Sequence, residues 1–437
     1  MTPRPPSHSR FAALLLMLLS LSLTADLTRA NERPATPQAS APNSAAPYQV
    51  WPLTADANAE DFSDLAPLGQ ALAGAQVVGL AEQTHGAHEE FAYKLRLLRY
   101  LHEELGFEVL QLESGFYDLG RISQAMARGE KLDDLASGNV FFMYSKSAEG
   151  RRMLQYVDQT QQSANPLKLA GTDSQHSGEL SGKTLLPGLQ AALTKAGHPD
   201  LVQGEPWRQM SRLSSALLAL QRQAPMADEQ TAFFTQTKRM RAALCGPKAA
   251  GGAAAPLLDG PAWWCRVVLS LEAQARSYWS QDADYQRDNV MGANSIWLTE
   301  QMFQGRKTVI WAHIVHLARG FQRSPTHLQA GEVMHRHWGG RYQVIHFSAG
   351  GGQILDFGSM QAQTLPTPAA GSLEAQLMAG KPMQPLLLHA ARPLEMPQYA
   401  FEYLQQGAET SLREGQLGRN WDWLVFFPSV RPVSMVR

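Results

Sequence analysis

Two short apolar runs separated by a helical pattern set the strongest constraint on the fold. The first run extends from Ala75 to Ala81 and the second from Phe107 to Leu112, and large apolar residues recur between them at helical spacing until Gly106. Apolar runs of this length predict buried strands, and recurrence every three or four residues predicts a helix. A strand, a helix and a strand in this order cross over right-handed into parallel pairing. We therefore expect an α/β fold.

Five later apolar runs indicate that the same sheet continues along the chain. They lie at Leu167 to Gly171, Thr308 to Ala312, Tyr342 to Phe347, Pro385 to His389 and Trp423 to Phe427. Residues 186–286 have no strand pattern, and their Leu, Ala, Gln and Arg content predicts a helical insertion that acts as a second subdomain or lid. The expected fold class is α/β, with a mostly parallel central sheet flanked by helices. Its two parts are residues 49–185 and 287–437.

The composition excludes a polycationic nucleic-acid-binding protein and a predominantly disordered one. Of the 437 residues, 38 are Lys or Arg and 39 are Asp or Glu, which gives a formal net charge of −1. We therefore expect no polycationic surface and no nucleic-acid partner. Hydrophobic residues make up 44% of the chain and charged residues only 18%, so the chain can build a large core and is not predominantly disordered.

The first residues have the pattern of a cleavable secretory signal. Two arginines precede an apolar run from Phe11 to Leu23, which is shorter than the about 20 residues that span a bilayer as a helix. We expect residues 1–30 to be a signal peptide and residues 31–48, rich in Pro, Ala and Ser, to be a disordered linker. The mature protein is then periplasmic or secreted, without a membrane span.

Acidic and imidazole side chains follow four of the predicted strands. Glu82 and His85 follow the first strand, Glu113 the second and Asp173 the third, and the fourth strand runs into His313. In parallel α/β sheets the carboxyl ends of the strands share one edge, where ligands bind. One polar residue after a strand is an ordinary helix cap, but four at one edge predict a functional site.

The residue types at this edge restrict the chemistry. The chain contains no Gly-x-Ser-x-Gly, the motif that carries the serine nucleophile of α/β-hydrolases. Cys245 and Cys265 are expected to pair, because an exported chain meets an oxidising compartment. Histidines and carboxylates remain, and these can take a proton from water near neutral pH. A carboxylate of Glu82 or Glu113 at one nitrogen of His85 would set the imidazole tautomer.

Ordered blocks of the sequence resemble the erythromycin esterase-like family. The blocks are Ala81-Glu82-Gln83-Thr84-His85-Gly86, Arg287-Asp288 with Met291 and Asn294, Trp311-Ala312-His313 with His316, and Trp421-Asp422-Trp423. The resemblance implies hydrolysis of a small-molecule ester without metal or cofactor, and in the best-known members that ester is the lactone of a macrolide antibiotic. Two departures, Ala81 in place of Gly and Ile314 in place of Asn, leave the substrate open.

The resemblance also implies roles for individual residues. His85 matches the general base, and Arg287 matches a cation that could stabilise a developing oxyanion. The other expected catalytic residues are Glu82, Glu113 and His313. Residues expected to bind the substrate are Lys94, His316, His88 and Asp173.

Two alternatives to this hydrolase stay open at the level of sequence. The pairs His85/His88 and His313/His316 have His-x-x-His spacing, and Glu113 could complete a zinc or iron shell, as in a metallohydrolase. The histidines could instead hold haem or another ligand in a binding protein of similar architecture. The sequence does not indicate the oligomeric state.

Overall fold

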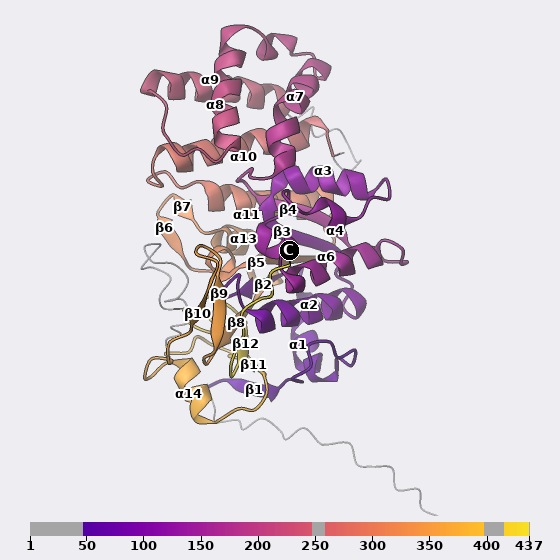
Figure 1. Cartoon of the computed structure of the whole chain (residues 1–437), viewed down its shortest axis with the longest axis vertical. Helices are drawn as coiled ribbons and strands as arrows, with labels where there is room; N and C mark the ends of the chain where they lie inside the picture. The colour runs from indigo at the N-terminus through magenta and orange to yellow at the C-terminus, as the bar shows by residue number, and fades with distance from the viewer. Residues whose placement is uncertain (1–46, 247–257, 397–414, 437) are drawn as a thin grey trace, which may run out of the picture. The chain divides into compact units, whose positions relative to one another are not determined.

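A single large sheet organises the part of the chain that the structure describes. The computed structural model describes residues 47–246, 258–396 and 415–436, so the predicted signal peptide and nearly all of the predicted linker lie outside it. The sheet has eight strands in the order β1-β11-β12-β8-β2-β5-β3-β4 (Figure 1). These strands are β1 (Gln49–Pro52), β2 (Val77–Glu82), β3 (Val109–Gly115), β4 (Lys168–Asp173), β5 (Thr308–His313), β8 (Tyr342–Ala349), β11 (Leu386–His389) and β12 (Trp423–Phe427).

The strand directions confirm the predicted fold class. From β12 to β4 all neighbouring strands pair in parallel, whereas β11 pairs antiparallel with β12 and with β1. Each of the seven predicted apolar runs forms a strand of this sheet. The structure adds β1, whose residues are mostly exposed at the sheet edge. An edge strand does not need a continuous apolar run, which explains why the sequence pattern did not reveal it.

Helices cover both faces of the sheet, because successive strand residues point to opposite faces and both sets are apolar. On β2, Val78 and Leu80 belong to the same core as the buried face of α2, while Val77 and Ala81 pack in a second core with α11 and α13. The helices before residue 179 are α1 (Ala66–Ala71), α2 (His88–Glu103), α3 (Phe116–Met126), α4 (Leu132–Leu135), α5 (Phe142–Ser145) and α6 (Ala148–Thr160). Those after residue 286 are α11 (Arg287–Trp297), α12 (Ile314–Leu317), α13 (Ala330–Trp338) and α14 (Leu373–Ala379).

The segment expected to be a helical insertion contains helices joined by loops, and its described residues form no strand. It contains α7 (Glu179–Lys195), α8 (Gly204–Leu218), α9 (Ala227–Leu244) and α10 (Pro261–Trp279). Helix α7 begins at Glu179, so the expected boundary at residue 186 falls inside it. These helices share a third core, in which Trp263 packs on Phe116 of α3. The predicted disulfide joins Cys245, after α9, to Cys265 in α10, with a Cα–Cα distance of 5.2 Å.

Two small hairpins lie outside the large sheet. They are β6 (Gln322–Ser324) with β7 (His327–Leu328), and β9 (Gln353–Asp356) with β10 (Gln361–Thr364). Within the described ranges no helix has both the length and the apolar character needed to cross a membrane.

Candidate active site

The ends of four adjacent parallel strands meet at one edge of the sheet. Strands β2, β5, β3 and β4 are neighbours in this order. Glu82 at the end of β2 lies in register with His313 at the end of β5, and Asp173 at the end of β4 pairs with Gly115 of β3. The irregular register near the end of β3 lies next to Glu113. The four polar strand ends singled out in the sequence therefore occupy one edge.

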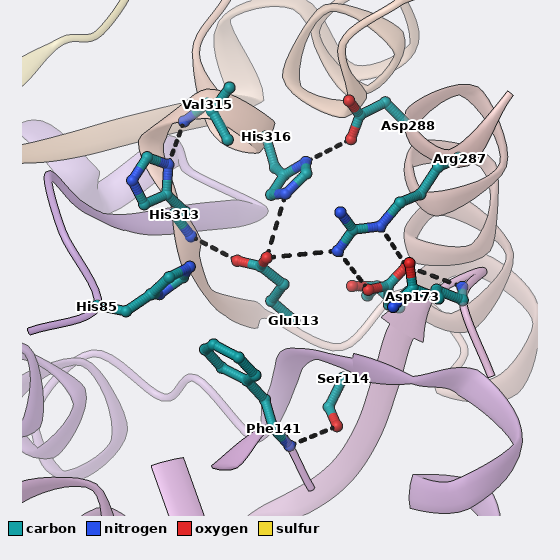
Figure 2. A network of polar contacts seen from close by, with 12 residues as sticks. His85, Glu113, Ser114, Phe141, Asp173, Arg287, Asp288, His313, Val315 and His316 are labelled. Carbon is teal, nitrogen blue, oxygen red and sulfur yellow. Dashed lines mark hydrogen bonds and ion pairs between the residues drawn. The ribbon is translucent and has the colours of Figure 1, made fainter. Parts of the chain in front are cut away.

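A partly enclosed cavity of about 200 Å³ lies at this edge. Its lining combines charged groups with aromatic rings, and Figure 2 shows most of these side chains converging. The lining residues are His85, Glu113, Ser114, Phe141, Asp173, Gln175, Ser177, Arg287, His313, Val315, His316 and Phe357. The ends of β3, β4 and β5, the helices α11 and α12, and four loops thus contribute to one polar site with an apolar wall.

His85 is held by a buried carboxylate. Its Nδ1 lies 3.2 Å from Oε1 of Glu82, whose side chain is completely buried. The same carboxylate accepts a hydrogen bond from the Tyr144 hydroxyl at 3.0 Å and forms an ion pair with Lys94. Because an ionised carboxylate only accepts, Nδ1 of His85 carries the proton in this pair. The other ring nitrogen, Nε2, is then the acceptor of the neutral imidazole.

The surroundings of His85 keep its imidazole neutral. Burial lowers the pKa of His85 to about 4, although the Glu113 carboxylate acts in the opposite direction. Ring centroids of Phe141, Phe357 and His313 lie 4.8, 5.1 and 4.9 Å from that of His85. These rings exclude water from most of the imidazole surface, which is the physical origin of the shift.

Glu113 is the centre of a second network, next to His85 (Figure 2). Its Oε2 accepts the backbone N–H of His313 at 2.8 Å, and its Oε1 lies 3.1 Å from Nε2 of His316. Arg287 Nη2 lies 3.6 Å from the same Oε1. Burial alone would raise the pKa of Glu113, but His316 and the other cations outweigh burial and hold that pKa well below its usual value.

The cations of this network have carboxylate partners of their own. Arg287 binds Asp173 through two hydrogen bonds of 2.9 and 2.6 Å, and His316 Nδ1 bonds to Asp288. Burial acts to lower the pKa of His316, yet the Asp288 and Glu113 carboxylates outweigh it and raise that pKa to about 10. The pKa of Arg287 is likewise held well above its usual value by Asp173, despite burial. Asp288, His316, Glu113, Arg287 and Asp173 thus form a continuous series of charged side chains with alternating sign.

His313 differs from the other two histidines of the cavity. Its Nδ1 accepts the backbone N–H of Val315 at 3.0 Å, so this nitrogen is unprotonated. Burial lowers the pKa of His313 well below its usual value, and the nearby His85 acts in the same direction. His313 is therefore a neutral side chain whose hydrogen bond caps the short helix α12.

Two residues expected to bind the substrate lie outside the cavity lining. His88 is the first residue of α2 and its Nδ1 lies 2.6 Å from Oε1 of Glu149. Lys94 is fully buried, bonds to Glu82 and has its Nζ 4.3 Å from the centroid of the Trp311 ring. Neither side chain lines the cavity, because α2 begins only after His85. His88 is therefore omitted from the site proposed below, and Lys94 acts through Glu82.

Sequence reasoning missed several residues that shape the site. Tyr144, Phe141 and Phe357 lie in helix α5 or in loops, and no motif marks them. Asp288 could have been found, since it follows Arg287 directly in one of the blocks that carry the family resemblance. An acid next to an expected site residue at a helix start is a usable signal.

One group of side chains offers metal-ligating atoms at suitable separations. Within the described ranges, ligand atoms of Glu82, His85 and Glu113 lie within 4.8 Å of one another. The oxygens of Glu82 are already bonded to Lys94, Tyr144 and His85, and those of Glu113 to His316 and the His313 backbone. A metal ion would therefore have to displace Lys94, a cation that already balances Glu82. The donor set is present, but its protein partners do not fit a metal centre well.

Solved structures of other proteins have a similar fold. A crystal structure of a Bacillus cereus protein is 21% identical, covers 89% of this chain and 97% of that chain, and has a TM-score of 0.71. A succinoglycan biosynthesis protein is 17% identical, with 88% and 95% covered and a TM-score of 0.64. A mutant of the erythromycin esterase EreC in its open conformation is also 17% identical, with 88% and 98% covered and a TM-score of 0.61. These likenesses establish the fold.

Two sequence comparisons concern the family of the chain. The putative hydrolase YbfO of Bacillus subtilis is 33% identical over 120 residues, which is 28% of this chain and only 26% of that relative. The model of the erythromycin esterase family matches residues 102–430. That range contains Glu113, Asp173, Arg287, His313 and His316 but begins after His85. Since it spans well over half of the sequence, the chain belongs to the erythromycin esterase family.

Proposed function

We propose that this protein hydrolyses a carboxylic ester or lactone by direct attack of a water molecule that His85 activates. The observation that supports this proposal most is the state of His85: a neutral imidazole whose Nδ1 is bound to Glu82 and whose ring lines the cavity. A carboxylate that holds one imidazole nitrogen sets the tautomer and stabilises the imidazolium formed during reaction. The free lone pair on Nε2 can then accept a proton from water.

In the proposed reaction, His85 transfers protons, whereas Arg287 and His316 stabilise negative charge. Nε2 of His85 takes a proton as the water oxygen bonds to the carbonyl carbon, and the carbonyl oxygen becomes an oxyanion. Arg287 and the protonated His316, which both lie next to Glu113, stabilise this negative charge. When the tetrahedral intermediate collapses, the carbon–oxygen bond to the alcohol breaks and the His85 imidazolium returns its proton to the leaving alcohol. The products are a carboxylic acid and an alcohol, and no cofactor takes part.

The cavity limits the substrate to part of a larger molecule or to a small ester. Its volume of about 200 Å³ is below the range of roughly 300–1,000 Å³ that pockets for drug-sized ligands have. A macrolide, one candidate substrate, would require displacement of wall residues such as Phe357. We further propose that the protein is exported, which agrees with the Cys245–Cys265 disulfide because such bonds persist in oxidising compartments.

The test is a panel of simple acyl esters, lactones and macrolides incubated with purified protein and followed by mass spectrometry for the gain of one water. We expect turnover that falls about 1,000-fold in His85→Ala but not in the control His337→Ala, a partly exposed histidine outside the site. Equal turnover by both variants would refute the role of His85. The same panel with a chelator tests the metallohydrolase, which alone predicts loss of activity on metal removal.

Titration with haem tests the binding-protein alternative. A Soret band that shifts in His313→Ala, together with no turnover of any ester, would favour that alternative over hydrolysis. Both ring nitrogens of His316 and Nδ1 of His313 already have protein partners, so we expect no such band.

A further inference from the structure

Residues Val430–Val436 cross three of the loops that surround His85, and we call this segment the strap. It begins where the range matched by the family model ends. Val430 and Val433 are buried in the core that α2 and α6 share with the sheet. The strap therefore packs against the protein and does not merely follow its surface.

The first loop held by the strap carries His85 itself. The backbone N–H of Val433 donates to the Gly86 carbonyl at 3.0 Å, and the N–H of His88 donates to the Arg431 carbonyl at 2.8 Å. Arg431 also bonds to Glu89 through its backbone and its guanidinium, at 2.7 and 2.8 Å. The residues on both sides of the His85 loop are thus fastened to the strap.

The second loop carries Tyr144, which bonds to Glu82. The N–H of Val436 donates to the Lys146 carbonyl at 2.8 Å, and the N–H of Ala148 donates to the Ser434 carbonyl at 2.7 Å. Glu149 joins this loop to the first, because its carboxylate accepts the Ser434 N–H at 3.0 Å and lies 2.6 Å from Nδ1 of His88. His88, expected from the sequence to bind substrate, instead contributes to this junction.

The third loop is the hairpin that carries Phe357 over the His85 ring. The N–H of Gln353 donates to the Val430 carbonyl at 2.9 Å, and the N–H of Leu355 donates to the Gly86 carbonyl at 3.0 Å. The hairpin approaches so closely that a Cβ on Gly86 would lie 1.8 Å from the Leu355 carbonyl oxygen. Only glycine fits at position 86. The hairpin therefore packs directly against the backbone of the His85 loop.

We propose that the strap positions His85 for catalysis by fastening the loops of His85, Tyr144 and Phe357 to one another. This inference rests on the proposed function, since it assigns the strap a part in the same reaction. The strap touches neither the cavity nor the substrate, and its residues are therefore positioning residues. They keep the His85 imidazole oriented toward Glu82, and they keep Phe357 where it excludes water from the imidazole ring.

Two changes to the strap test the proposal. Removal of residues 431–437 should lower kcat about 100-fold with a much smaller change in KM, because small misplacements of a catalytic group have effects of this size. Val433→Ala, which deletes a buried side chain but keeps the backbone hydrogen bond, should lower kcat about ten-fold. Val433→Ile should retain activity. The matched control is Val202→Ala, an equally buried valine in the helical region.

The imidazole titration of His85, followed by nuclear magnetic resonance of labelled histidine, gives a readout that needs no substrate. In Val433→Ala its midpoint should move from about 4 toward the ordinary value, because water reaches the ring, whereas Val202→Ala should leave it in place. Identical kcat values and midpoints in the two alanine variants would overturn the proposal, even if the shortened chain fails to fold. If no ester is hydrolysed by the unaltered protein, the proposed function fails while this titration still tests the strap.

Discussion

His85 and His316 line the same cavity and both contact carboxylates, yet their pKa values move in opposite directions. The pKa of His85 falls to about 4 and that of His316 rises to about 10. Burial lowers the pKa of both rings. His316 forms ion pairs with two carboxylates, Asp288 and Glu113. His85 forms one with Glu82, which is also paired with Lys94, and the nearby Glu113 carboxylate does not outweigh the burial of His85.

The comparison shows that a carboxylate neighbour does not by itself make an imidazole cationic. The balance depends on how many carboxylates flank the ring and on whether other cations already neutralise them. In this cavity the outcome is a neutral histidine able to accept a proton beside a charged one able to stabilise an anion. Both states are needed for the proposed hydrolysis, and both hold near neutral pH.

Among changes to the partners of the two histidines, the largest effect is expected when Glu82 loses its cation. Lys94→Met leaves a buried carboxylate without its balancing charge next to His85, which should raise the pKa of His85 above about 4 and make it resemble His316. We expect kcat to fall about 100-fold and the acid limb of the pH profile of kcat/KM to move to higher pH. Lys183→Met, at an exposed lysine paired with Glu179, is the control. An acid limb that stays at the same pH would show that Lys94 is not the cause of the different pKa values of His85 and His316.

An intermediate effect is expected when His316 loses one of its carboxylates. The raised pKa of His316 means that its contribution to stability is complete below its ordinary value of 6.5 and is lost as the pH rises through about 10. Asp288→Asn should therefore move the alkaline loss of stability about one to two pH units lower and reduce turnover about ten-fold. Thermal unfolding between pH 6 and 11 measures the first change. Coincident stability curves for the two proteins would contradict the assignment of Asp288.

The smallest effect is expected at Tyr144. Tyr144→Phe removes one hydrogen bond to Glu82 but leaves Lys94 in place, so kcat should fall only about five-fold, as expected for a contribution of ~1 kcal/mol. Tyr156→Phe, which loses a hydrogen bond to Glu103 near the surface, should leave turnover unchanged. A loss as large as that in Lys94→Met would mean that the hydrogen bond from the hydroxyl matters to Glu82 as much as the ammonium does.

Much of the sheet could be predicted because its strands are buried on both faces. Val77 to Glu82 and Thr308 to His313 are completely buried, and such strands appear in the sequence as continuous apolar runs. Strand order could not be read in the same way. Strand β5 lies between β2 and β3 although many residues separate it from both along the chain, and only the assembled sheet places its His313 beside Glu82.

The sequence by itself determined the α/β class, the helical character of the segment before Arg287, the disulfide partners and the polar residues at the strand ends. Local spacing and residue type carry this information. The tertiary structure alone decided that Lys94 and His88 lie outside the cavity lining, that Tyr144 and Phe357 reach His85, and which histidine is charged. These properties depend on burial and on charges brought together from distant positions, and neither is present in any short stretch of sequence.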